Sequence, residues 1–168
     1  MAEPTNKNFL SPIGFRFNMQ RLPNINYFCT NASIPDITLG QVDTVTNTFI
    51  KLPVPGDRLT FGSLSLRFKI DEDLTNYKEI YDWMITLGYP DNFEQRAQVE
   101  RGQDGSVYSD GSLIILTNSY KPNIEVKFVD LYPTSLSTVD FDITGTDIEY
   151  LNPDVVFQYR KYELTVLS

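Results

Sequence analysis

The chain has 168 residues, a formal net charge of −8, one Cys and no His. Its length fits one domain, so we treat residues 1–168 as a single unit. The missing His and the lone Cys exclude histidine acid–base chemistry, the usual zinc ligand sets and an internal disulfide. The acidic balance argues against a basic surface that holds phosphate backbones. We therefore expect no catalytic, cofactor or metal site and no tight nucleic-acid binding.

Neither an export signal nor a membrane span is predicted. Residues 1–8 lack a basic stretch followed by an apolar one, and the longest aliphatic run is only Leu113 to Leu116. We expect a soluble protein that does not bind membranes. The aromatic content of 13% favours a sheet-rich domain.

Two short strands are predicted near the N-terminus. Phe15, Phe17 and Met19 alternate with polar residues, which is the period of a half-buried strand. A proline-containing segment, Leu22 to Asn24, ends this strand. A second strand-like run follows at residues 27–30, and we expect a hairpin here.

Residues 40–57 have a different composition. Thr and Val favour extended structure in this segment, which then closes on Pro53, Pro55 and Gly56. We expect a protruding, strand-like loop.

The clearest strand pattern covers residues 63–70. Apolar side chains alternate there with polar ones, which predicts one buried side and one side that faces solvent. The apolar set is Leu64, Leu66, Phe68 and Ile70, and the polar set is Ser63, Ser65, Arg67 and Lys69.

One amphipathic helix is predicted over residues 74–88. Large apolar side chains recur there at spacings of three and four, so they form a stripe that should lie against a sheet. We expect Asp73 or Thr75 to cap the helix, with the acidic run from Asp71 favouring its positive end. The residues assigned to the stripe or its edge are Leu74, Tyr77, Ile80, Tyr81, Trp83, Met84 and Leu87.

The rest of the chain predicts one long connection and further strands. The connection, residues 91–112, is polar and contains several glycines. The strand-like runs are 113–119, 124–132, 139–143 and 154–167. In the last run the apolar positions change parity near Arg160, where we expect a β-bulge. The whole pattern predicts a mainly β fold with one flanking helix.

Three segments carry a resemblance to a known family. They are PGDRLTFGSLSLRFKIDEDLTNYKEIYDWM at residues 55–84, LYPTSLSTVDFD at 131–142 and VFQYRKY at 156–162. With the Phe-x-Phe strand and the segment at 33–36, they span essentially the whole chain in the family's order. The set resembles the tail tube family of contractile-tailed bacteriophages, which includes the myovirus tube protein and the tube-like domains of baseplate tube initiators.

The resemblance implies two packed antiparallel sheets with a helix on the flank. It implies a homohexameric ring whose inner sheets join in one β-barrel, and rings that stack into a hollow conduit for genome ejection inside a contractile sheath. The implied partners are further copies of the chain, the tail sheath protein, the tape-measure protein and the baseplate tube initiator. DNA would cross the lumen without specific binding. The implied location is the virion tail, assembled in the cytoplasm of the bacterial host.

Two surfaces are assigned on this basis. The loop at 40–57 would lie on the adjacent ring and mediate stacking, through Val45, Thr48, Phe49, Ile50, Leu52 and Pro53. The polar side of the 63–70 strand would face the aqueous lumen, through Ser63, Ser65, Arg67 and Lys69. An acidic lumen would repel phosphate and let DNA slide.

Other roles and sites stay open. A baseplate tube initiator, or a neck or tail adaptor ring, has the same implied fold, but initiators usually carry insertions that this compact chain does not show. A ring-forming tube protein of a secretion system is a further alternative. The acidic run at 71–73 fits a helix start better than a cation site. The segment at 104–111 resembles a calcium loop in composition only, which favours a surface turn. Cys29 has no base nearby, which favours a structural role.

Overall fold

The computed structural model describes residues 3, 7–45, 51–88, 107–144 and 149–167, and within these the chain is mainly β. The strands are β1 (Phe15–Met19), β2 (Cys29–Ala32), β3 (Ile37–Val45), β4 (Lys51–Phe61), β5 (Leu64–Phe68), β6 (Ser109–Leu116), β7 (Pro122–Leu136), β8 (Asp154–Gln158) and β9 (Lys161–Val166). The helices are α1 (Pro23–Phe28) and α2 (Thr75–Gly88). The predicted fold class is confirmed.

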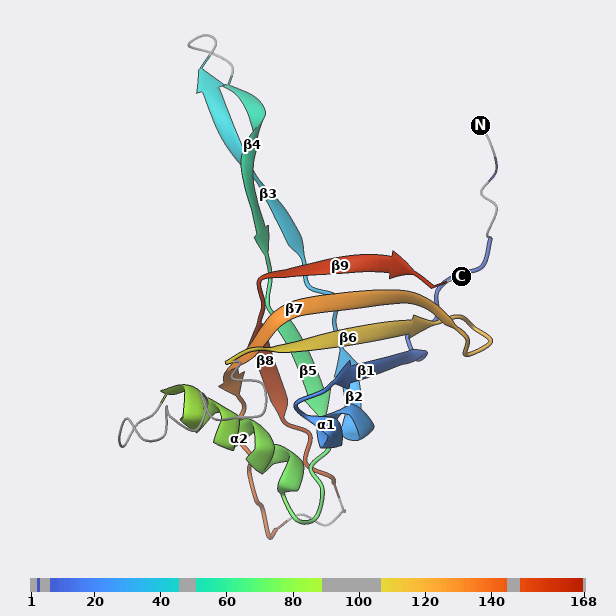
Figure 1. The fold of residues 1–168 in the computed structure, drawn as a ribbon, viewed down its shortest axis with the longest axis vertical. Helices are drawn as coiled ribbons and strands as arrows, with labels where there is room; N and C mark the ends of the chain where they lie inside the picture. Colours follow the sequence, from blue (N-terminus) through green and yellow to red (C-terminus); the bar gives the residue numbers. More distant parts are fainter. Residues whose placement is uncertain (1–2, 4–6, 46–50, 89–106, 145–148, 168) are drawn as a thin grey trace.

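Two antiparallel sheets share strand β7 and face each other across the core. The first sheet contains β1, β6, the first half of β7 and β9, and the second contains β2, β5, β8 and the second half of β7. In Figure 1 the strands of the first sheet run across the view, whereas β5 and β8 run down it. Among the described strands, β3 and β4 pair only with each other and form a separate ribbon.

The corner between the two sheets lies at Asp130 and Arg160. Asp130 has a φ of 60°, and its carboxylate forms an ion pair with the Arg160 guanidinium at 3.2 Å. The Arg160 amide donates to the Val129 carbonyl at 3.0 Å. Strands β8 and β9 therefore pair with β7 on either side of this corner. The expected β-bulge near Arg160 is wrong, because the parity changes where the chain passes from one sheet to the other.

The core is built by the apolar alternation of the strands. On β5 the side chains of Leu64, Leu66 and Phe68 are fully buried, while Ser65 and Arg67 point to solvent. Burying such a side chain contributes roughly 1.5–3 kcal/mol. A shift of β5 by one residue would turn these side chains to solvent and lose that free energy. The largest fully buried side chains are Phe68, Phe128, Phe157, Met19, Leu22, Ile25, Leu64, Leu66, Ile80, Leu131, Val126 and Val155.

Helix α1 occupies a segment where the sequence pattern predicts a break followed by a strand. Pro23 fits the first helical turn, where a missing N–H costs nothing. Asn26 then ties the helix to β1, because its side chain accepts from the Met19 amide at 2.8 Å and donates to the Met19 carbonyl at 2.9 Å. Strand β2 pairs with β5 rather than with β1. The expected hairpin is therefore wrong, and α1 is a second helix beside the one predicted.

Helix α2 lies where it was expected, but its buried stripe differs. Ile80, Trp83 and Asn76 are buried. Leu74 is 39% exposed and Tyr81 is 51% exposed, so both were wrongly assigned to the core. Leu74 has a φ of 55° just before the helix, and Tyr81 lies one residue off the stripe. The others, Tyr77, Met84 and Leu87, are partly buried against the core.

The start of α2 is organised by Asp71 rather than by the predicted caps. The carboxylate of Asp71 accepts from the Asn76 amide at 3.3 Å, and the Asn76 side chain accepts from the Asp71 amide at 3.4 Å. Asn76 also donates to the Lys69 carbonyl at 2.8 Å. This reciprocal pair assigns the capping role to Asp71, so the prediction of Asp73 or Thr75 is wrong.

Two further boundaries differ from the sequence prediction. Strand β6 begins at Ser109, inside the connection expected over 91–112, and residues 89–106 lie outside the described residues. The candidate strand at 139–143 pairs with no other strand in the described structure, and its Ile143 is fully exposed. The alternating pattern at 139–143 is therefore not part of a sheet in the described structure.

Candidate assembly surfaces

The described residues contain no group of three or more His, Cys, Asp or Glu side chains placed to hold a metal ion. Burial raises the pKa of the Cys29 thiol to about 11, so this thiol is a poor nucleophile at neutral pH. Neither described helix combines the length and apolar character needed to traverse a bilayer.

The ribbon of β3 and β4 projects from the body of the molecule (Figure 1). Its pairs run from Ile37 with Phe61 at the base to Val45 with Lys51 at the far end. The strands therefore cover more than the loop predicted at 40–57. The predicted stacking residues Thr48, Phe49 and Ile50 lie outside the described residues.

Two prolines lie inside β4, although the sequence pattern predicts that they close the segment. Pro53 is paired with Asp43, and Pro55 is paired with Gln41. The prolines are two residues apart, so both lack an N–H on the same edge of the strand. A proline is tolerated where that edge has no partner. The outer edge of β4 is therefore unable to donate hydrogen bonds at these two positions.

Apolar side chains cover the ribbon without a core beneath them. They occupy odd positions near the base and even positions farther out, and the parity changes at Gly40 on β3 and Gly56 on β4. The exposed apolar residues are Ile37, Leu39, Leu59, Val42, Leu52 and Val54, with exposures from 41% to 60%. Contiguous exposed apolar side chains of this kind mark a protein interaction surface.

An aromatic cluster holds the base of the ribbon. The ring of Phe61 lies 5.3 Å from that of Tyr162 and 6.1 Å from that of Tyr159. The Tyr162 hydroxyl donates to the Pro35 carbonyl at 3.3 Å. Burial, followed by the charges of Tyr162 and Asp36, raises the pKa of Tyr159 to about 12. The ribbon is thus anchored at its base to β9 and to the segment that joins β8 and β9.

The first sheet ends in two edge strands, β1 and β9, each paired on one side only in the described structure. On β9, Leu164 is opposite Val126 and Val166 is opposite Ile124. Val126 is fully buried, but Leu164 is 62% exposed and Val166 is 67% exposed. The apolar face that lines the core therefore continues onto β9, where no other layer of the described structure covers it. An open strand edge with exposed apolar side chains is a template for pairing with another chain.

The predicted lumen residues lie on the outer side of the second sheet. Ser65 and Arg67 are exposed on β5, and Ser63 and Lys69 are exposed at its two ends. Arg67 forms two hydrogen bonds to Asp154 of β8, at 2.8 and 2.9 Å. These bonds lower the pKa of Asp154 and raise that of Arg67. This wall is polar, and its arginine is neutralised locally.

The outer side of the first sheet is a second polar wall, which was not predicted from the sequence. Neighbouring strands place Ser112, Lys127 and Glu163 in one row. Glu163 accepts a hydrogen bond from Lys161, and the charges of Lys161 and Lys127 help to lower its pKa. The alternation of polar and apolar residues on β7 and β9 is visible in the sequence. The pairing that joins them into one wall is not.

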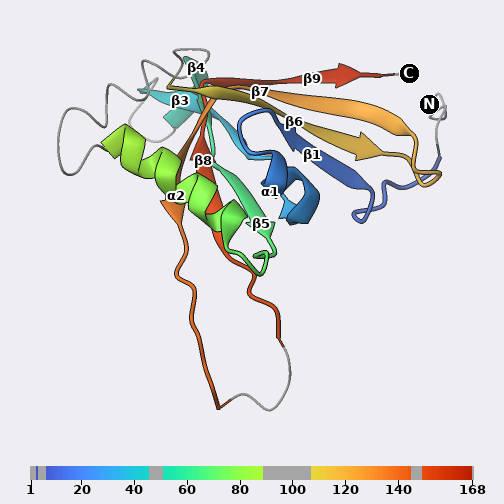
Figure 2. The ribbon, with the colours of Figure 1, turned by 60° about the horizontal axis from the view of Figure 1, so that its bottom comes forward.

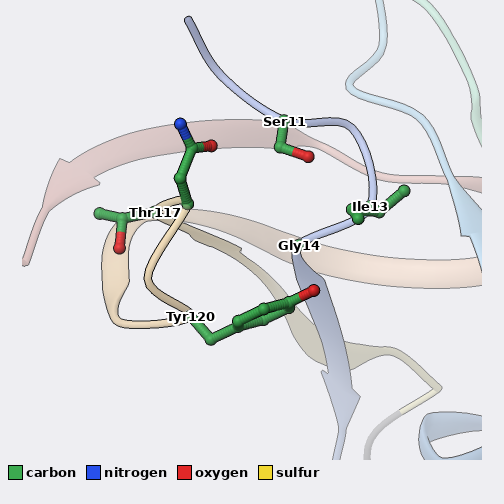
Figure 3. Close-up of a pocket in the computed structure, with 6 residues that line it drawn as sticks. Ser11, Ile13, Gly14, Thr117 and Tyr120 are labelled. Carbon is green, nitrogen blue, oxygen red and sulfur yellow. The ribbon is translucent and has the colours of Figure 1, made fainter. Parts of the chain in front are cut away.

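A shallow hollow of about 180 Å³ lies at one end of the first sheet (Figure 3). It forms where the segment before β1 crosses the turn between β6 and β7, and Asn118 donates to the Phe9 carbonyl at 3.2 Å. Its lining residues are Ser11, Ile13, Gly14, Thr117, Asn118 and Tyr120. This lining has no charged side chain, so it provides neither an acid–base pair nor an ion site.

A family model described as phage tail tube protein matches residues 2–165. The chain belongs to the phage tail tube protein family. The resemblance carried by the three sequence segments is thereby confirmed. Members of this family are components of the phage tail, so the virion tail is the setting in which the ribbon and the open strand edges are to be understood.

One curated relative of this tail tube family protein is the tail tube terminator protein of Enterobacteria phage T4. The two are 29% identical over 133 residues, which are 77% of this chain and 66% of that protein. The match thus spans slightly less than two thirds of the relative's length.

Solved structures of contractile injection systems have the same fold. The anti-feeding prophage cap, described as a tube-terminating cap, has a TM-score of 0.67 at 15% identity and covers 98% of this chain and 96% of its own. A chain of the sheath–tube complex of an extracellular contractile injection system has a TM-score of 0.60 at 14% identity, over 96% and 94%. The sheath/tube terminator of that system has a TM-score of 0.59 at 16% identity, over 95% and 99%.

Proposed function

We propose that this tail tube family protein forms a homohexameric ring that terminates the tube of a contractile phage tail. The observation that carries the proposal is the first sheet, which is open at both β1 and β9 and exposes Leu164 and Val166 on its core face. Pairing β9 of one copy with β1 of the next satisfies both edges. Repetition of one such head-to-tail contact closes a ring.

Two comparisons favour a terminator over a repeating tube subunit. The T4 relative is a tube terminator, and the structure with a TM-score of 0.67 is a tube-terminating cap. Compact length, which favours the tube over an initiator, does not separate a tube subunit from a terminator. The terminator belongs with the adaptor rings, which the sequence leaves open as an alternative.

The repeating tube subunit is the second candidate, and the ribbon favours it. Exposed apolar residues such as Val42, Leu52 and Val54 would be covered if the ribbon lay on an adjacent ring. In a tube subunit that ring is another copy of the chain, and in a terminator it is the last ring of the tube. Val45 and Pro53 are part of the same proposed stacking surface.

The rest of the proposed assembly follows the family. If the chain is a terminator, its proposed neighbours are the tube protein, the sheath protein and the tape-measure protein. If it is a tube subunit, the baseplate tube initiator is also a proposed neighbour. DNA passes the lumen without specific binding, and assembly occurs in the host cytoplasm. Two polar walls are candidates for the lumen lining, namely that with Ser65 and Arg67 and that with Lys127 and Glu163.

Ring formation is tested with the purified full chain by light scattering coupled to size exclusion and by negative-stain microscopy. Single rings that do not extend support the terminator, and long hollow tubes support the tube subunit. A monomer at every concentration overturns both. Leu164→Asp with Val166→Asp should abolish rings, because charges on the β9 face cannot be buried at the contact. Leu59→Asp on the ribbon is the matched control, which should leave rings intact.

The lumen wall is tested by thiol labelling of assembled rings, in a Cys29→Ser background. Lys127→Cys and Ser65→Cys are compared, using a maleimide attached to a polymer too large to enter the ring. The residue that faces the lumen is labelled only by a small maleimide. Equal labelling of both positions by the large reagent would exclude both walls.

A further inference from the structure

Residues 139–143 have the pattern of a strand without a sheet. Val139, Phe141 and Ile143 alternate with Asp140 and Asp142, as in a strand with one apolar and one acidic side. Phe141 is 77% exposed and Ile143 is fully exposed. Within the part of the chain that the structure describes, neither side chain is packed in a way that would account for its apolar character.

The excursion that carries this segment is longer than the sheet requires. At its base Leu136 of β7 pairs with Val155 of β8, and the Ser137 amide donates to the Asp154 carbonyl at 2.8 Å. Antiparallel neighbours in this position can be joined by about two residues. The chain instead uses 137–153, and in Figure 2 the described parts of this stretch lead away from both sheets. A long excursion that leaves a closed base is typical of a binding loop.

The charged residues of the excursion are all acidic. Residues 137–153 include four Asp or Glu and no Lys or Arg. Asp142 accepts from the amide and the hydroxyl of Thr144 at 2.8 and 2.6 Å, and these bonds lower the pKa of its carboxyl. Asp142 is therefore charged at neutral pH, and the extended stretch ends in a fixed turn.

We propose that residues 139–143 add as a strand to an open sheet edge of a different tail protein. Such a partner has an apolar groove for Phe141 and Ile143 and Lys or Arg side chains facing Asp140 and Asp142. Strand addition supplies backbone hydrogen bonds for affinity, and the alternate side chains supply specificity. This contact is separate from the contacts that close the proposed ring. It rests on the proposed function in one respect only, namely that the partner is a protein of the same tail.

A different protein fits better than a second copy for two reasons. Each copy has a net charge of −8, so an acidic loop is repelled by the average surface of its own kind. In the proposed ring, β1 and β9 are already paired with neighbours, and β3 belongs to the ribbon proposed to lie on an adjacent ring. The open edge of the second sheet, β2, has only four residues and a register shift, so it is a poor template for another strand. The outer edge of β4 lacks donors at Pro53 and Pro55, so it is a poor acceptor of an added strand.

The test is site-specific photocrosslinking in assembled tails. The full chain with p-benzoylphenylalanine in place of Phe141 is supplied to infected cells alongside the wild-type chain, and irradiated tails are analysed by mass spectrometry. We expect one dominant crosslink, to an edge strand of another tail protein with Lys or Arg nearby. The probe in place of Tyr120, which is 65% exposed and outside the loop, should not yield this product. Asp140→Asn with Asp142→Asn should reduce the yield several-fold, because it removes the charges proposed to face the partner.

Several results would overturn the inference. These are crosslinks only to the same chain or to a second copy, no crosslink from position 141, or a yield unchanged by the two Asn substitutions. Ring formation by the same labelled chain is measured separately. Intact rings without the crosslink reject the loop contact alone, whereas loss of rings in the unlabelled chain rejects the proposed function.

Discussion

A Cβ on Gly56 would lie 2.8 Å from the carbonyl oxygen of Gly40 and 3.0 Å from its carbonyl carbon. The two strands of the ribbon therefore touch backbone to backbone where its apolar positions change parity. Gly56→Ala should force them apart, with a local cost of about 1–3 kcal/mol typical of overpacking. Because the ribbon projects beyond the core, we expect faster amide hydrogen exchange in β3 and β4 and unchanged exchange in β5 and β8.

Gly88→Ala is the control for this change. A Cβ there would meet no atom within 4 Å, so exchange in the ribbon should stay as in the wild type. Unchanged ribbon exchange in Gly56→Ala would mean that the close approach at Gly40 is relieved without cost.

The buried side chain of Asn76 should be required for stability. It donates to the Lys69 carbonyl at 2.8 Å and accepts from the Asp71 amide at 3.4 Å, at the start of α2. Asn76→Ala removes the side-chain partner of these two part-buried backbone groups, so unfolding free energy should fall by about 1–3 kcal/mol. Urea denaturation, followed by the fluorescence of the single tryptophan, Trp83, measures this change.

Thr75→Ala separates the two assignments of the cap. If Asp71 organises the helix start, loss of the exposed Thr75 hydroxyl should change stability by less than about 0.5 kcal/mol. A larger loss in Thr75→Ala than in Asn76→Ala would restore Thr75 as the cap.

Patterns that depend on local periodicity were predictable from the sequence. Burial of Leu64, Leu66 and Phe68 follows from a period of two, whatever strand lies beside them. Helix α2 follows from spacings of three and four. Helix α1 was missed because its six residues begin with a proline and rely on the contact between Asn26 and Met19, which no local pattern shows.

Features that depend on which strands pair were not predictable. A proline ends a strand inside a sheet but is tolerated at a free strand edge. The continuation of β4 through Pro53 and Pro55 therefore could not be predicted from the sequence. The corner at Asp130 and Arg160 appeared in the sequence only as a parity change. In the sequence, Leu164 has the pattern of a core residue. It is exposed because the described fold places no second layer over this part of the sheet, and a local pattern cannot show that.

The ion pair of Arg67 and Asp154 should make the stability of the fold depend slightly on pH in the acid range. Hydrogen bonding to Arg67 lowers the pKa of Asp154 in the folded state, so the pair stabilises fully above the unfolded value of about 4. This stabilisation is lost as the pH falls through the lower folded pKa. The effect is small because the pair is exposed and screened by solvent. Asp154→Asn should lower the thermal midpoint slightly at neutral pH and flatten its fall in acid.

Thermal melts of the wild type and Asp154→Asn across the acid range measure this difference. Asp57→Asn, a change at an exposed position of β4 away from the pair, is the control and should keep the wild-type slope. Parallel curves for the wild type and Asp154→Asn would show that the pair does not contribute.

The prolines of β4 should protect the ribbon from uncontrolled strand addition. Pro53→Thr with Pro55→Thr restores two N–H donors on the outer edge and raises strand propensity there. We expect the double variant to form species larger than the wild-type assembly as concentration rises, measured by light scattering. Pro12→Thr, an exposed proline outside the strands, should behave as the wild type. If the double variant instead matched the wild type at every concentration, the outer edge of β4 would be protected by something other than its missing donors.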